Sequence, residues 1–99
     1  AFVHKPAAVI SSSRRAGSVT SMDVLNKHLS ISEMPIVTSN YWNEVHGHTP
    51  SDVEQDREGL DTMYALGKNM AWMLKCIEAG KKAGIEVPQN KKRTTNFIR

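Results

Sequence analysis

Serines, arginines and a glycine gather near the start of the chain, in the stretch SSSRRAGS at residues 11–18. Serine hydroxyls and backbone N–H groups can satisfy a polar ring edge or an anion, and Gly17 permits conformations that other residues avoid. The stretch lacks the glycine spacing of a P-loop or a dinucleotide fingerprint. We therefore interpret it as a binding loop for a ring or an anion, with a simple strand-to-helix connection as the alternative.

A second group of chemically versatile side chains lies at residues 40–50, in NYWNEVHGHTP. Tyr41 and Trp42 could stack on a ring or cover another subunit. His46 and His48 flank Gly47 and could bond a substrate or face solvent. Two histidines at this spacing without a third firm ligand do not make a zinc site, so we predict no metal.

Composition narrows the class of protein. The chain has 99 residues, 13 basic and 10 acidic side chains and a single cysteine, Cys76, which excludes an internal disulfide. No apolar run approaches the roughly 20 residues of a membrane span. The net charge of +3 comes from the tail, without the interleaved aromatics of nucleic-acid motifs. We expect a cytoplasmic protein that binds neither membranes nor nucleic acid.

The elements that must position these loops follow from the apolar periodicity. Thr20 or Ser21 could cap a first helix, and Thr49 could cap a second one that starts at Pro50. The pattern predicts a strand over 5–10, a loop over 11–18, a helix over 20–32, a strand over 34–39, a loop over 40–49, a helix over 50–83 and a basic tail over 85–99.

Strand, helix and strand in this order predict an α/β fold with parallel strands, so both loops should follow carboxyl ends on one edge. The long helix should pack through a stripe formed by Leu60, Met63, Gly67, Met70, Leu74 and Ile77, with Gly67 at a close approach. Two strands alone leave a parallel sheet uncovered. We expect it to be completed by assembly with other chains or by the rest of a longer protein.

Three stretches carry a family resemblance: KPAAVISSSRRAGSVTSMDVL, MPIVTSNYWNEVHGHTP and QDREGLDTMYALGKNMAWMLKCIEAG. Together they resemble the C-terminal half of the NAD(P)H-dependent FMN reductase family, which includes iron–sulfur flavoproteins and tryptophan-repressor-binding-protein-like quinone reductases. The resemblance implies the β-α-β-α part of a flavodoxin-like doubly wound parallel sheet. It also implies FMN as cofactor, NAD(P)H as co-substrate, a small-molecule electron acceptor and a homo-oligomer. The family's phosphate-binding loops belong to the other half of its domain.

The resemblance also implies which residues touch the flavin, because the loop after the first strand borders the isoalloxazine ring in this family. The expected FMN contacts are Ser12, Ser13, Arg14, Arg15, Ala16, Gly17, Tyr41 and Trp42. No catalytic residue is assigned. Two alternatives stay open beside the flavin oxidoreductase: a non-catalytic half-domain that oligomerises or complements a partner, and a small anion-binding protein.

Overall fold

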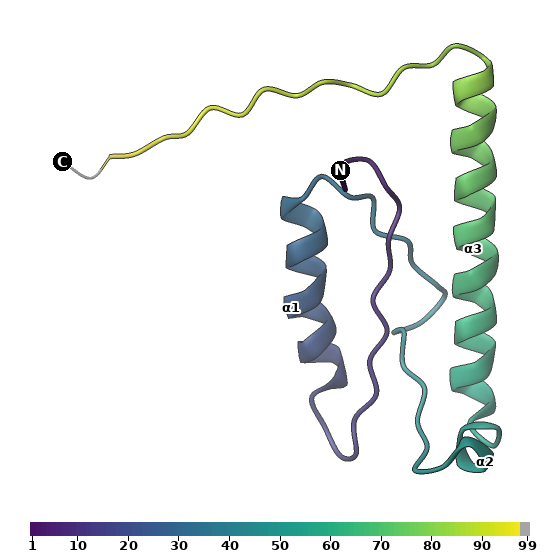
Figure 1. Ribbon diagram of the computed structural model, residues 1–99. Helices are drawn as coiled ribbons and strands as arrows, with labels where there is room; N and C mark the ends of the chain where they lie inside the picture. Colours follow the sequence, from purple (N-terminus) through teal and green to yellow (C-terminus); the bar gives the residue numbers. More distant parts are fainter. Residues whose placement is uncertain (98–99) are drawn as a thin grey trace.

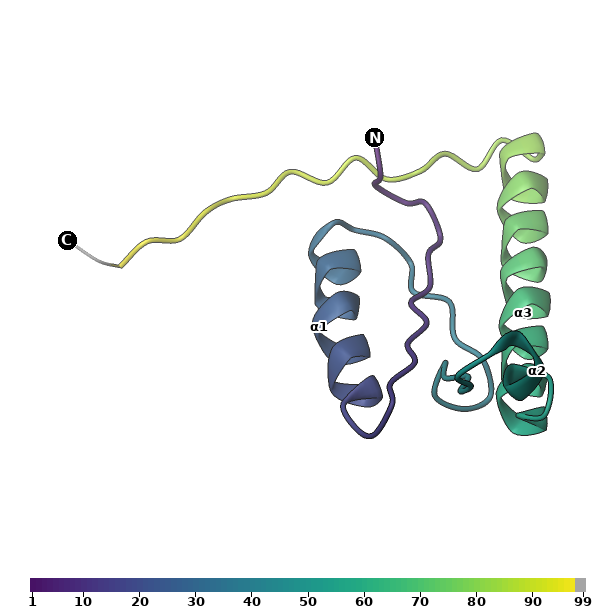
Figure 2. The same ribbon diagram turned by 60° about the horizontal axis from the view of Figure 1, so that its bottom comes forward.

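The computed structural model describes residues 1–97 and contains three helices. They are α1 (Ser18–Ile31), α2 (Pro50–Val53) and α3 (Arg57–Lys82). Two extended segments lie between α1 and α3 in both views (Figures 1 and 2). The chain after α3 is an extended tail that crosses back past the N-terminus, where Nε2 of His4 lies 3.0 Å from the Pro88 carbonyl oxygen and Nδ2 of Asn90 donates to Oε2 of Glu33 at 3.4 Å (Figure 1). The last two residues of the predicted basic tail, 98–99, lie outside the described residues.

The predicted α/β fold is wrong, because the described residues form no sheet. The flavodoxin-like doubly wound arrangement that was expected is therefore wrong as well. Helix accounts for 45% of the described residues and strand for 4%. The segments predicted as strands over 5–10 and 34–39 are extended and run parallel. They are joined only by two isolated bridges, Ala7 to Ile36 and Ser11 to Glu44.

A mismatch of register explains why two bridges do not grow into a ladder. Four residue steps separate the bridged positions of the first segment, but eight separate those of the second. Val37 donates its N–H to the Ala7 carbonyl oxygen and Asn43 accepts from the Ser11 N–H, so residues 38–42 loop out between the bridges. The side chain of Asn43 partly fills the gap, since its Nδ2 donates to the carbonyl oxygen of Val9 at 3.0 Å.

Helix α1 begins directly after Gly17, whose φ of 101° lies in the left-handed region that favours glycine. No side chain caps this end, so the expected cap at Thr20 or Ser21 is wrong; both residues lie within the helix. The first intrahelical bond runs from the Ser21 N–H to the Gly17 carbonyl oxygen at 2.9 Å. The N–H groups of Ser18, Val19 and Thr20 precede this bond and have no partner within the helix.

The predicted helix over 50–83 is interrupted at residues 54–56, between α2 and α3. The expected cap at Thr49 is confirmed: its hydroxyl accepts from the Asp52 N–H, while the Asp52 carboxylate accepts from the Thr49 N–H at 3.0 Å. Such a capping box satisfies two backbone donors at once. Asp56 then caps α3 by accepting from the Gly59 N–H at 2.9 Å.

Helix α3 packs through a different face from the predicted one. The buried positions are Gly59, Thr62 and Leu66, whereas Leu74 and Ile77 of the predicted stripe are exposed. Burial of Thr62 is possible because its hydroxyl donates to the Glu58 carbonyl oxygen at 2.8 Å, so no polar atom is left unpaired. The more apolar stripe is left partly open.

The close backbone approach lies at Gly59 and not at Gly67. A Cβ on Gly59 would overlap the Asp56 carboxylate and lie 3.0 Å from the Cα of Val45. A Cβ on Gly67 would meet nothing within 4 Å. The start of α3 is therefore in close contact with Val45, directly before His46.

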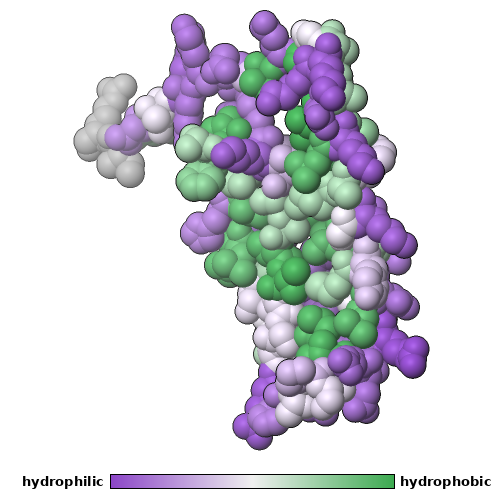
Figure 3. Space-filling view, turned by 45° about the vertical axis from the view of Figure 1, so that its right-hand side comes forward, coloured by the Kyte–Doolittle hydropathy of each residue, from purple (hydrophilic) through white to green (hydrophobic). Residues whose placement is uncertain are grey.

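The core is small for the length of the chain. Only Met22, Val37 and Leu66 are buried hydrophobic residues among those described. The surface amounts to 8441 Å², whereas a compact monomer of 11.0 kDa exposes about 5,600 Å². Hydrophobic side chains gather in a band down the face seen in Figure 3, bordered by hydrophilic ones. No helix of the described chain has the length and apolar character to cross a membrane.

Candidate functional site

The serine–arginine loop (residues 12–17) and the histidine loop (residues 46–48) meet at one end of the two extended segments. The bridge between Ser11 and Glu44 fixes the points from which both loops depart, and the segments run parallel, so the loops leave side by side. Together they surround an open pocket of about 820 Å³. We call it the loop pocket; its lining residues are Ser12, Ser13, Arg14, Arg15, His46, Gly47 and His48.

The loop pocket carries positive charge that acidic side chains do not neutralise. Within residues 1–97, no ion pair involves Arg14 or Arg15. The adjoining N-terminus of α1 has no acidic residue in its first turn and no side-chain cap. A helix start with free N–H groups favours negative charge, as do guanidinium groups. The pocket therefore suits an anion or an electron-rich ring edge.

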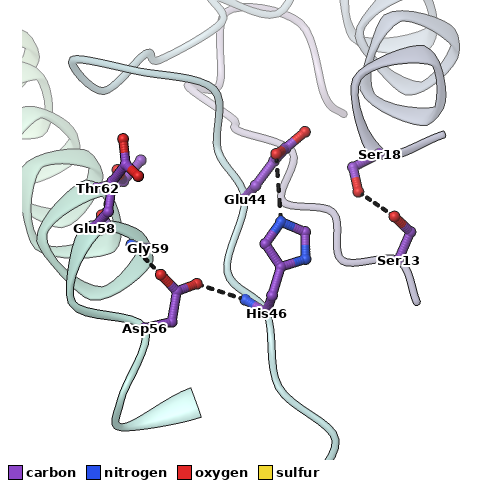
Figure 4. Close-up of polar contacts among 8 residues, drawn as sticks. All are labelled: Ser13, Ser18, Glu44, His46, Asp56, Glu58, Gly59 and Thr62. Carbon is purple, nitrogen blue, oxygen red and sulfur yellow. Dashed lines mark hydrogen bonds and ion pairs between the residues drawn. The ribbon is translucent and has the colours of Figure 1, made fainter. Parts of the chain in front are cut away.

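A short hydrogen bond holds the loop in shape. The hydroxyls of Ser13 and Ser18 lie 2.7 Å apart, and Ser18 is buried at the start of α1 (Figure 4). Ala16 and Gly17 do not line the loop pocket. They border a smaller hollow beside it, together with Ser13, Arg15, Glu44, His46 and the first residues of α1.

Two carboxylates hold His46 in place (Figure 4). Its backbone N–H donates to Oδ2 of Asp56 at 2.8 Å, and its ring Nε2 lies 3.4 Å from Oε2 of Glu44. Hydrogen bonds from the Gly59 and His46 N–H groups lower the pKa of Asp56 below its usual value. This carboxylate therefore stays ionised and ties the histidine loop to the start of α3.

Sequence reasoning left the roles of His46 and His48 open, although both line the loop pocket. The signal was present, because both follow the second extended segment on the edge where the serine–arginine loop was expected. Throughout residues 1–97 the structure contains no group of three or more histidine, cysteine, aspartate or glutamate side chains suited to a metal ion.

The structure does not bring Tyr41 and Trp42 to the loop pocket. Both lie in the loop-out at 38–42, with their ring centroids 6.1 Å apart and their planes at 41°. They line a separate groove beside α1. The eight expected FMN contacts thus divide: four line the loop pocket, Ala16 and Gly17 border the adjoining hollow, and the two aromatic residues lie elsewhere.

Comparison with known proteins yields no match to this chain among family models, curated proteins or solved structures.

Proposed function

We propose that this chain contributes the ring-side wall of a flavin site in an NAD(P)H-dependent FMN oxidoreductase. The observation that carries the proposal is the meeting of the two loops, which joins Arg14 and Arg15 to His46 and His48 in one open pocket. The resemblance of the sequence to the FMN reductase family motivates the choice of flavin over other electron-rich rings.

The residues of the loop pocket fit the pyrimidine end of an isoalloxazine ring. That end carries carbonyl oxygens, which accept hydrogen bonds from guanidinium and backbone N–H groups. The chemistry that FMN supplies when bound is acceptance of a hydride from NAD(P)H and delivery of the two electrons to a small-molecule acceptor, with negative charge on the reduced ring. Arg14, Arg15 and the start of α1 would stabilise that charge, and His46 could donate a hydrogen bond at the pocket's rim.

The test is a binding titration with FMN and riboflavin, followed by quenching of flavin fluorescence. Because the proposed contacts are with the ring, riboflavin should bind within about threefold of FMN. The double variant Arg14→Gln, Arg15→Gln should weaken both at least tenfold, as expected when charge-assisted hydrogen bonds are removed. The matched control is Lys91→Gln, Lys92→Gln in the tail, which removes the same charge and should leave binding unchanged.

Three results would refute the flavin proposal. One is the absence of binding of either flavin at tens of micromolar protein. Another is an equal loss in both double variants, which would indicate general charge attraction. The third is binding of FMN but not riboflavin, with competition by inorganic phosphate, which would favour the anion-binding alternative.

We also propose, as a second function, that the chain self-associates through α3. The exposed surface exceeds that of a compact monomer by about 2,800 Å², part of it in the tail, whereas a standard interface buries about 1,600 Å² in total. Leu74 is 49% exposed on the apolar stripe that α3 leaves open. A second copy of this stripe is the occupant that we favour.

Sedimentation equilibrium tests the association. The native chain should form dimers or larger assemblies at tens of micromolar, and Leu74→Gln should weaken association at least tenfold. Tyr64 is exposed on the same helix but off the stripe, so Tyr64→Gln should not. A monomer at all concentrations, or an equal effect of both variants, would refute this proposal.

A further inference from the structure

Helix α3 is longer than the rest of the chain covers. It continues past the end of α1 in Figure 1, and residues 74–79 are all exposed. Leu74 and Ile77 of the apolar stripe lie in this part. Gly67 is exposed too, and a Cβ there would meet nothing within 4 Å. The other members of the stripe are half-buried: Leu60, Met63 and Met70. The whole stripe therefore reaches the surface.

Charge is distributed unevenly along α3 and the residues that flank it. Residues 50–61, from α2 to the first turns of α3, carry five acidic side chains and one basic one. Residues 75–93, from the last turns of α3 into the tail, carry six basic side chains and two acidic ones. No ion pair within residues 1–97 joins these two regions. The start of α3 is therefore negative and its end positive, and neither neutralises the other.

An antiparallel pair of α3 helices brings unlike charges together, because the negative start of each copy then lies beside the positive end of the other. A parallel pair would place like charges side by side, which is unfavourable. The body of the chain favours the same orientation. It packs on the first half of α3, at Gly59, Thr62 and Leu66, so the bodies of two antiparallel copies lie at opposite ends of the pair.

The stripe fixes the register of such a pair. Its members alternate in steps of three and four residues, as in a coiled-coil seam, and its middle lies between Gly67 and Met70. Two antiparallel copies overlap along the full stripe only when Leu60 lies opposite Ile77 of the second copy. Gly67 then lies opposite Met70 of the second copy, at the two-fold axis. The absence of a side chain on Gly67 allows the helices to approach closely there.

In this register Arg57 lies beside Glu78 of the second copy. The two residues are three heptads apart on one helix, so they occupy the same flank of the stripe, and both are exposed. The offset between them along the pair is about two residues, or roughly 3 Å. Arg57 makes no ion pair within residues 1–97. Glu78 pairs with Lys82 at 3.3 Å, an exposed contact on its own helix that leaves it available.

We propose that two copies of the chain pair antiparallel along α3, with the two-fold axis near Gly67, and that Arg57 of each copy binds Glu78 of the other. Two-fold symmetry forms this contact twice. The pairing rests on the self-association proposed above and specifies its partner, orientation and register. It does not depend on the flavin function, since none of its residues lines the loop pocket.

Charge reversal followed by mixing tests the contact. Arg57→Glu or Glu78→Arg alone places like charges in both contacts, so each variant should self-associate at least fivefold more weakly than the native chain in sedimentation equilibrium. An equimolar mixture of the two variants has unlike charges in both contacts and should regain the native dissociation constant within about threefold. The control is Lys68→Glu, which changes the net charge as Arg57→Glu does but lies off the stripe. It should associate as the native chain does.

Cysteine crosslinking reports the orientation directly. Cys76→Ala removes the native thiol, and Arg57→Cys and Glu78→Cys are then made in separate chains. Antiparallel pairing predicts a disulfide only when the two chains are mixed and oxidised. Each variant alone should form none, because identical positions lie about 28 Å or more apart along the pair, beyond the reach of a disulfide. Circular dichroism checks that these substitutions of exposed residues leave the helices intact.

The outcomes separate this pairing from self-association as such. Disulfides within each variant alone, without one in the mixture, would indicate a parallel pair and overturn the proposal. Association that the charge reversals do not weaken, with no mixed disulfide, would also overturn it while leaving self-association in place. A native chain that is monomeric at all concentrations would refute self-association and this pairing together.

Discussion

The same substitution at two glycines of α3 should change stability in opposite directions. Gly67 is exposed and a Cβ there would meet no other atom within 4 Å, so Gly67→Ala should stabilise the chain by up to about 1 kcal/mol through helix propensity. Gly59→Ala has at most the same benefit. Its methyl group, however, would overlap the Asp56 carboxylate and press on the Cα of Val45.

The difference in stability between the two variants depends on how easily the atoms around residue 59 can move. The Asp56 side chain could swing away only by giving up its hydrogen bonds to the Gly59 and His46 N–H groups. Val45 would have to shift its backbone. Overpacking of this kind costs about 1–3 kcal/mol. The helix-propensity gain is common to both variants, so Gly59→Ala should be about 1–3 kcal/mol less stable than Gly67→Ala.

Urea unfolding followed by far-ultraviolet circular dichroism measures both free energies, and a shared slope would show that the two variants unfold alike. The control within the experiment is Gly67→Ala itself, which changes the same helix by the same atoms. Equal stabilities of the two variants would refute the reasoning. A second readout is the amide signal of His46, which should move in Gly59→Ala and stay in place in Gly67→Ala.

Three further expectations concern stability. Because the pKa of Asp56 is lowered on folding, its ionised carboxylate stabilises the fold. This stabilisation is complete above the unfolded-state pKa of about 4 and is lost as the pH falls through the lower folded-state pKa. Melting temperatures of the native chain and of Asp56→Asn should therefore converge in acid. Leu66→Ala should cost about 2–5 kcal/mol in urea unfolding, because it empties one of the three buried apolar positions found within residues 1–97. Thr49→Ala should cost about 1 kcal/mol by thermal melting, since it breaks the capping box, and Thr49→Ser should restore most of the loss.

Local chemistry explains what the sequence could predict. Thr49 and Pro50 start a helix because their side chains act on the adjacent backbone, and such signals are complete within a few residues. The sequence also predicted that the two loops lie close together, because parallel segments bring their carboxyl ends to the same edge. In the structure, Arg14 and His46 line one pocket.

Long-range register explains what the sequence could not predict. The residues near Ile36 do not reveal that the eight steps from Ile36 to Glu44 span the same bridges as the four steps from Ala7 to Ser11. The apolar pattern therefore favoured a sheet that does not form. The packing face of α3 was missed for a related reason. Apolar periodicity favours Leu74, but the helix buries Thr62, whose hydroxyl is satisfied by its own helix. The groove that Tyr41 and Trp42 line depends on the same loop-out and had no local signal.

The excess of four residue steps between the two bridges has a consequence for how such a chain can diverge. The segment 38–42 can lose or gain residues without moving Ala7 from Ile36 or Ser11 from Glu44, because the residues that form the hydrogen bonds of both bridges lie outside it. Surface loops between fixed points are where natural proteins tolerate changes in length. Such changes would reshape the groove that holds Tyr41 and Trp42 while the loop pocket keeps its geometry. The shapes of the groove and of the loop pocket can therefore change independently within one short polypeptide.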